Sequence, residues 1–403
     1  MLVGITLEEA VSLICQEAKK CEQAAEISVE EAGGYCLAED VYAQIDNPPF
    51  PRSPLDGYAV DAADLVGVSK ENPAVLRVVD CVYAGEDGQA KVLKRGEAIR
   101  IMTGAPFPQG SNTVVRQEDT DYGEEIVHIY KEQKAFDNYC YQGEDYEKGT
   151  LMLKKGERIT FAEQGILAGL GRTSVKVCKK PVVRMLTTGD EVCAPGTTLL
   201  SGKIYDSNTM MVSCRMQELG IPLASKKHVA DSEEVMAEEL KQACQDADII
   251  ITTGGVSVGK KDILHGALEK LGARKIFWRV RIQPGTPTIF SVYENTLIIS
   301  LSGNPFGAMA NLELLVRPLL HEMTGDSRYV MKQKEGIMKV EFPKKSKGRR
   351  FVRAIYNDGE ITLPNGLFSS GAIGSLRGCN CLLDIQPGTP AIPVGEKVTV
   401  WML

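Results

Sequence analysis

The chain has 403 residues of ordinary globular composition and a formal net charge of −7. Its length is enough for two to four domains. The negative charge argues against general binding to nucleic acid, and no apolar run approaches the roughly 20 residues that span a bilayer, so we expect no membrane segment.

The numbers of cysteines and histidines limit the kinds of disulfide, metal and catalytic site that the chain could contain. The 11 cysteines are an odd number and include no CxxC pair, which favours reduced thiols in the cytoplasm over a disulfide framework or a zinc site. Four histidines without an HExxH motif leave little material for a histidine metal site or a Ser-His-Asp triad. The first twenty residues are acidic and lack a long apolar core, so we do not expect a secretory signal.

The N-terminal half begins with an amphipathic helix over 6–20, "TLEEAVSLICQEAKK", which starts at a capping threonine. The segment "NPPFPRSPLDGYAV" (47–60) has four prolines in its first eight residues and predicts an extended stretch that leads into a strand. Short β runs separated by Gly, Pro and Asp from about 60 to 140 predict a small β-domain. Residues 161–177 predict a helix and a strand.

Strands and helices alternate from about 181 to 326, which predicts a three-layer α/β domain with a mainly parallel sheet. Short β runs then return to the end of the chain. The expected fold is therefore multidomain, α/β plus β. Its parts are a discontinuous linking N-terminal region (1–46 and 140–178), a β-rich lid domain (47–139), the α/β domain (179–326) and a β-barrel-like C-terminal domain (327–403).

The stretch "IIITTGGVSVGKKD" (249–262) runs a buried strand into a glycine-rich turn. In an open α/β sheet, ligands bind at the carboxyl ends of the strands, where glycine lets backbone N–H groups approach a phosphate. Asp231 and Asp262 would hold Mg²⁺ against that phosphate. Two simpler readings stay open, in which the glycines only form a tight turn and the aspartates only cap helices. The sequence has neither a Walker loop nor GxGxxG after the first strand of the unit.

Several motifs occur in a specific order along the chain: "PPFPRSPLDGYAV", "TGAPFP", "QGED", "TTGDEV", "YDSN", "TTGGVSVGKKD", "PGTP" and "LSGNPFGA". In this order they resemble the MoeA / gephyrin E-domain family, and the resemblance covers nearly the whole chain. The α/β domain accordingly resembles the MogA/MoaB adenylyltransferase fold.

The resemblance implies a molybdopterin molybdenumtransferase of molybdenum cofactor biosynthesis. Such an enzyme takes adenylated molybdopterin and molybdate or tungstate, inserts the metal into the dithiolene and releases AMP with the help of Mg²⁺. It also implies a homodimer, whose active cleft lies between the α/β domain of one subunit and the proline loop and β-domain of the other, and contact with a MogA-type adenylyltransferase.

The resemblance assigns roles to individual residues. Catalytic roles fall to Asp56, Glu191 and Asp262, and metal binding to Asp231 and Asp262. The implied substrate-binding residues are Thr103, Asp145, Gly254, Gly255, Ser257, Arg279, Ser302, Gly303, Asn304, Pro305 and Arg353.

The chain departs from the family pattern where the oxyanion is expected. Gln283 and Thr286 of "QPGTP" replace lysines, and Gly378 replaces a serine found in some members. An oxyanion needs cationic or N–H donors, and the candidates in the sequence are Arg279, Arg281, Arg353 and Arg377.

Two other functions remain open from the sequence. A MogA-like adenylyltransferase would use the same α/β domain, but that group is a single domain. A non-catalytic pterin-binding or scaffold paralogue would fit the replaced lysines, whereas the retained Asp56, Glu191, Asp231 and Asp262 favour catalysis.

Overall fold

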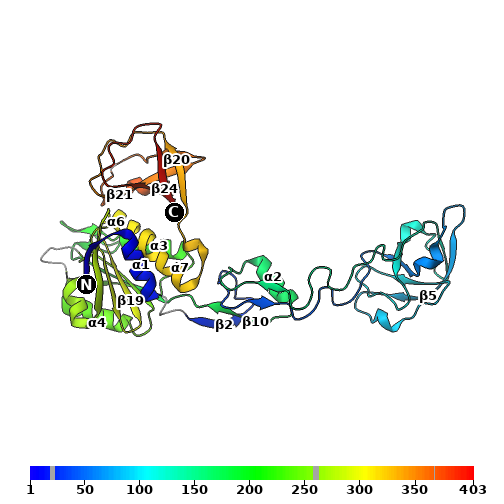
Figure 1. The fold of residues 1–403 in the computed structure, drawn as a ribbon. Helices are drawn as coiled ribbons and strands as arrows, with labels where there is room; N and C mark the ends of the chain where they lie inside the picture. The colour runs from blue at the N-terminus through cyan, green and yellow to red at the C-terminus, as the bar shows by residue number, and fades with distance from the viewer. Residues whose placement is uncertain (19–22, 257–262, 367) are drawn as a thin grey trace. The chain divides into compact units, whose positions relative to one another are not determined.

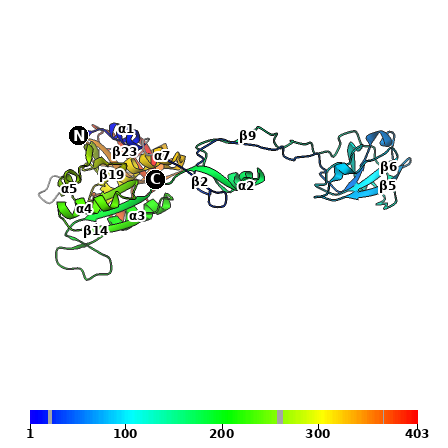
Figure 2. The ribbon, with the colours of Figure 1, turned by 90° about the horizontal axis from the view of Figure 1, so that it is seen from below.

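The computed structural model describes residues 1–18, 23–256, 263–366 and 368–403, which separate into two compact units (Figure 1; Figure 2). The larger unit comprises Met1–Glu39, Lys155–Gly165 and Thr173–Leu403, and the smaller one Asp40–Lys154 and Ile166–Arg172. Each unit has its own apolar core. None of the helices in these residues has the length and hydrophobicity needed to cross a membrane.

A seven-stranded sheet forms the centre of the larger unit, in the order β1-β16-β18-β19-β15-β11-β14. All neighbouring strands in its described residues are parallel except the two pairs made by β18, so the predicted mainly parallel sheet is confirmed. The strands are β1 (Leu2–Ile5), β11 (Val183–Thr188), β14 (Ser225–Val229), β15 (Ile249–Thr253), β16 (Arg274–Val280), β18 (Ile289–Tyr293) and β19 (Thr296–Leu301).

Helices cover both faces of this sheet (Figure 1). One face packs against α1, α3, α6 and α7, and the other against α4 and α5. This is the predicted three-layer arrangement. The helices are α1 (Leu7–Ala18), α3 (Asn208–Glu218), α4 (Glu233–Ala243), α5 (Leu264–Leu271), α6 (Pro305–Asn311) and α7 (Arg317–Thr324), with a π-helical segment, Leu312–Val316, between the last two.

The N-terminal strand and helix pack onto the α/β domain, whereas the sequence grouped residues 1–46 with the linking region. Strand β1 pairs in parallel with β16, and the apolar face of α1 lies in the same core as α7. The capping box at Thr6 and Glu9, in which Glu9 Oε2 accepts from the Thr6 N–H at 2.7 Å, shows that the helix itself was predicted correctly. An amphipathic pattern identifies a helix but not the surface that buries its apolar face.

The C-terminal strands close into a barrel, as predicted. In the described residues β21 pairs with β22, β22 with β20, β20 with β24, β24 with β23, and β23 again with β21. A short strand of the α/β domain, β17 (Ile282–Gln283), pairs with β21 from outside. The barrel strands are β20 (Gln333–Met338), β21 (Arg349–Asn357), β22 (Glu360–Thr362), β23 (Cys381–Ile385) and β24 (Lys397–Met402).

The remaining part of the larger unit contains the antiparallel pair of β2 (Ala24–Ser28) and β10 (Ser174–Cys178). Helix α2 (Phe161–Gly169) lies beside this pair, where Gln164 Nε2 donates to the Val29 carbonyl at 2.8 Å.

The smaller unit is β-rich, as predicted for the lid domain. Its sheet has the order β7-β4-β6-β5-β8, and β3 pairs separately with β9. The strands are β3 (Val41–Tyr42), β4 (Gly57–Val60), β5 (Ala74–Val82), β6 (Glu97–Ile101), β7 (Thr113–Arg116), β8 (Ile126–Ile129) and β9 (Leu151–Leu153).

Candidate active site

A cavity of about 660 Å³ lies at the carboxyl ends of β11, β15 and β19. Its walls include residues 187–189, 253–256 and 302–305, together with Glu191, Asp206 and Asp231. These three acids are the charged groups among the described lining residues, which contain no Lys, Arg or His. We call this space the acidic cavity.

Asp231 braces the loop that follows β11. Its Oδ1 accepts a hydrogen bond from the Thr188 hydroxyl, and its Oδ2 accepts one from the Asp190 N–H at 3.1 Å. The adjacent Ser232, not Asp231, caps α4, since the Ser232 hydroxyl accepts from the Val235 N–H at 3.4 Å. The helix-cap reading of Asp231 is therefore excluded, and its carboxylate is left facing the acidic cavity.

The other two acids lie in the segment that connects β11 to α3 (residues 189–207). Glu191 precedes β12 (Val192–Cys193), which pairs in parallel with β13 (Ile204–Tyr205). Asp206 follows β13, and its carboxylate accepts a hydrogen bond from the Thr209 N–H at 2.9 Å. This bond satisfies a backbone N–H in the first turn of α3. Asn208 Nδ2 donates to the Gly303 carbonyl at 2.7 Å, so the start of α3 is tied to the "SGN" turn.

The glycine turn after β15 needs its glycines for steric reasons. Gly254 has a φ of +92°, and a Cβ on it would overlap the carbonyl oxygen of Thr188. Gly255 also lies in the left-handed region, at +62°. The turn therefore brings backbone close to the floor of the acidic cavity, a geometry that both the phosphate-binding reading and the tight-turn reading allow. The predicted Ser257 and Asp262 lie outside the described residues.

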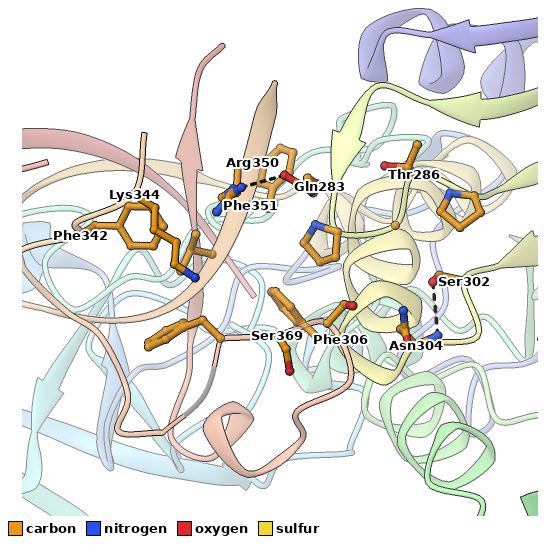
Figure 3. A pocket seen from close by; sticks show the side chains of 16 residues that line it. Gln283, Thr286, Ser302, Asn304, Phe306, Phe342, Lys344, Arg350, Phe351 and Ser369 are labelled. Carbon is orange, nitrogen blue, oxygen red and sulfur yellow. Dashed lines mark hydrogen bonds between the residues drawn. The ribbon is translucent and has the colours of Figure 1, made fainter. Parts of the chain in front are cut away.

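A second cavity, of about 420 Å³, lies between the α/β domain and the barrel. Its described lining contains two charged side chains, Lys344 and Arg350, and no Asp or Glu. We call it the cationic cavity. Figure 3 shows both cations on the barrel side, opposite Gln283, Thr286 and Ser302 from the α/β domain.

The two cavities adjoin. Pro287, Ser302 and Asn304 line both of them, so the "PGTP" and "SGNP" turns form the wall between an acidic and a cationic space. The sequence had placed Ser302, Gly303, Asn304 and Pro305 at one site, and the structure brings all four to this wall.

A buried amide fixes these two turns to each other. Asn311 is fully buried, its Oδ1 accepts from the Ser302 N–H at 3.2 Å, and its Nδ2 donates to the Gly285 carbonyl at 2.9 Å. Gly285 has a φ of +92°, and a Cβ there would lie 2.5 Å from Asn311 Nδ2. The close approach explains why glycine occupies this position.

Two predicted arginines lie outside both cavities as described. Arg279 lies over the ring of Trp278 at 5.5 Å. Arg353 is fully buried, 4.4 Å from the centroid of Phe306, and its Nη2 donates to the Ser369 carbonyl at 3.1 Å. Because Phe306 and Ser369 line the cationic cavity, Arg353 supports its wall from behind.

In the smaller unit, the structure brings Asp56 and Thr103 together. Asp56 Oδ1 accepts from the Thr103 N–H at 2.7 Å and from its hydroxyl at 2.8 Å. These two bonds hold the pKa of Asp56 below its ordinary value, and the bond from the Thr103 backbone N–H has the larger effect. Asp145 pairs with the same proline segment, since its Oδ2 accepts from Asn47 Nδ2 at 2.8 Å.

Sequence reasoning did not assign roles to Asp206, Asn208, Asn311, Lys344 and Arg350. The "YDSN" motif carried a usable signal, because Asp and Asn just before a helix often cap it or bond a neighbouring loop. Lys344 and Arg350 belong to the basic segment "KKSKGRRFVR" (344–353), and the sequence could not show which of its cations face a cavity and which face solvent.

The fold defines a multidomain protein in which a three-layer α/β domain, with ligand-sized cavities at the carboxyl edge of its sheet, is followed by a β-barrel. Residues 184–322 match the model described as a probable molybdopterin binding domain. Residues 5–171 match the MoeA N-terminal region (domain I and II), and residues 335–403 the MoeA C-terminal region (domain IV).

The chain belongs to the molybdopterin molybdenumtransferase (MoeA) family. It is 34% identical to the molybdopterin molybdenumtransferase of Bacillus subtilis, over 99% of this chain and 94% of that protein. It is 33% identical to the one of Staphylococcus epidermidis, over 98% and 95%. The structure of a molybdopterin biosynthesis MoeA protein from Pyrococcus horikosii superposes with a TM-score of 0.86 at 30% identity, covering 99% of both chains.

Proposed function

We propose that the protein inserts molybdenum from molybdate into the dithiolene of adenylated molybdopterin and releases AMP. The observation that carries this proposal is the pair of adjoining cavities of opposite charge, which share Pro287, Ser302 and Asn304. In this reaction the phosphoanhydride is cleaved while the oxyanion delivers its metal to the dithiolene, so the Mg²⁺-bound anhydride and the oxyanion need two such spaces side by side. The family membership supports the same reaction.

The acidic cavity suits a phosphoanhydride that arrives with Mg²⁺. Mg²⁺ typically takes one or two carboxylates together with phosphate oxygens and water. Asp231, Glu191 and Asp206 line the cavity, although no three His, Cys, Asp or Glu side chains in the described residues converge on one metal position. These carboxylates fit a Mg²⁺ site that the protein shares with the substrate, whose phosphate oxygens would complete the coordination. The resemblance implies Asp262 as a further ligand. Bound Mg²⁺ would neutralise charge on the departing AMP.

The proposal extends to Asp56 and Asp145 in the smaller unit. The bonds from Thr103 lower the pKa of Asp56 and fix the position of its carboxylate, which suits an electrostatic or metal-directed role. Following the resemblance, we propose that these acids act in a homodimer, on the active cleft of the other subunit, in a cytoplasmic enzyme that receives its pterin from a MogA-type adenylyltransferase.

The direct test measures AMP release from adenylated molybdopterin with Mg²⁺, with and without molybdate or tungstate. Oxyanion-dependent release is the expected result, and it would also show which metal is preferred. Tight pterin binding without release would contradict the proposal and favour a binding protein.

A matched pair of variants tests the acidic cavity. Glu191→Gln removes one of its charges, and we expect AMP release to fall at least tenfold. The control is Glu294→Gln, in the turn between β18 and β19, at the opposite edge of the sheet, which should leave AMP release unchanged. Equal activity of the two variants would argue against a role for Glu191.

A further inference from the structure

The positive charge of the cationic cavity comes entirely, among its described lining residues, from the C-terminal barrel. The α/β side contributes residues 283–287, Ser302 and Asn304, which carry no charge, while Lys344 and Arg350 are supplied by the barrel. Gln283 and Thr286 stand where the resemblance leads us to expect lysines.

Strand pairing places Arg350 at this cavity. β17 and β21 pair in parallel with Gln283 opposite Arg350, and Arg350 Nη2 donates to Gln283 Oε1 at 2.9 Å (Figure 3). Side chains alternate along a strand, so Arg349 faces the other way, where Asp384 holds it through bonds of 2.9 and 2.8 Å. The structure thus separates two adjacent arginines into one that is structural and one that faces the cavity.

The guanidinium of Arg350 is not saturated with hydrogen bonds. Its Nε is buried and has no hydrogen-bond partner among the described residues. It shares the barrel's inward face with Val352, which lines the cavity and belongs to the barrel core. A guanidinium that lines a cavity without carboxylates, next to apolar barrel residues, is well suited to an oxyanion, because low polarity strengthens the charge-assisted bond.

Lys344 supplies the second charge from the loop between β20 and β21. It lines the cavity beside Phe342, whereas the neighbouring Lys345 and Lys347 are not part of its described lining. Two cations without a carboxylate match the charge of a dianion such as molybdate, in a protein whose overall charge is −7.

We propose that Arg350 and Lys344 hold the oxyanion in this chain, and that Gln283 is a positioning residue that orients Arg350. This inference rests on the proposed function, because it names the groups that bind the second substrate. It predicts that the cations missing from the "QPGTP" turn are replaced from across the cavity, by the barrel.

The test uses the full-length protein and two measurements: direct binding of molybdate or tungstate by calorimetry, and the oxyanion KM for AMP release. Arg350→Gln should weaken oxyanion binding and raise this KM about tenfold or more, with the KM for adenylated molybdopterin unchanged. Lys344→Gln should act in the same direction. Arg350→Lys should recover part of the affinity, since it restores the charge but not the planar fork.

Gln283 gives a sharper test of positioning. Gln283→Leu should raise the oxyanion KM because Arg350 loses its acceptor, and Gln283→Glu should raise it further, because a carboxylate would pair with Arg350 and repel the dianion. Circular dichroism and the pterin KM should not change in either variant.

Matched controls are Lys345→Gln, next to Lys344, and Lys347→Gln, in the same loop; both side chains are exposed and neither is among the described residues that line the cavity. Both should bind the oxyanion like the wild type. If Arg350→Gln binds molybdate as well as Lys347→Gln does, the inference is overturned even though the wild type releases AMP. If the wild type shows no oxyanion-dependent release, the proposed function fails, and the calorimetric comparison still decides whether Arg350 binds an oxyanion.

Discussion

Replacing Asn311 by alanine should weaken both the α/β domain and its site. The side chain is fully buried and makes one bond to the Ser302 N–H and one to the Gly285 carbonyl. Alanine leaves both backbone groups unsatisfied in the interior, at about 1–3 kcal/mol each, so we expect a loss of about 2–6 kcal/mol in the free energy of unfolding of this domain. The turns at Gly285 and Ser302, which alanine no longer holds together, line the two cavities. KM should therefore rise for the oxyanion and for the pterin.

The assay follows denaturant unfolding by tryptophan fluorescence. The chain has two tryptophans, Trp278 in β16 and Trp401 in β24, so a Trp401→Phe background reports on the α/β domain through Trp278. The midpoint should fall while the denaturant slope m stays constant, which identifies a change in stability and not in the denatured state.

Asn380→Ala is the matched control. Asn380 also makes two backbone bonds, accepting from the Tyr356 N–H at 2.8 Å and donating to its carbonyl at 2.9 Å, but it is exposed. Water can take over both bonds, so its cost to the barrel, measured through Trp401 in a Trp278→Phe background, should be clearly smaller. The reasoning is refuted if Asn311→Ala costs no more than this control.

Three further predictions follow from single contacts. Glu313 is buried between Arg215 and Arg317, and Arg215 keeps a second partner in Glu218. Glu313→Gln should cost about 3–5 kcal/mol in thermal or denaturant unfolding, because it leaves the buried Arg317 uncompensated; a loss below about 1 kcal/mol would contradict this. Thr103→Val should raise the pKa of Asp56 in an NMR titration, because the hydroxyl donor is lost. A carboxyl whose pKa is lowered in the folded state stabilises that state above the pKa it has in the unfolded chain, and this stabilisation is lost as the pH falls. The wild type should therefore lose more stability than the variant below about pH 4. Burial raises the pKa of Cys36 to about 12, so alkylation at pH 8 should label the exposed Cys214 and spare Cys36; mapping Cys36 among the labelled peptides would refute this.

Much of the fold could be predicted from the sequence because its signals are local. Alternating strands and helices indicated the α/β domain, and a threonine followed three residues later by glutamate marked the start of α1. The partner of that helix could not be predicted, since an apolar stripe does not say what covers it. Only the pairing of β1 with β16 showed that the N-terminus joins the α/β sheet.

The sequence by itself determined which residue types stand at the carboxyl edge of the sheet: glycines in left-handed turns, acids after the strands, and the "SGNP" turn. Only the tertiary structure decided how charge is divided there. Lys344 and Arg350 lie at least forty residues from Asn304 in the chain, and strand pairing between β17 and β21 brings the barrel segment that carries them to the same cavity. The physical reason is that the sequence of a basic segment does not specify which way each side chain points. A strand in a fixed register does specify it, so that Arg349 bonds Asp384 and Arg350 faces the cavity.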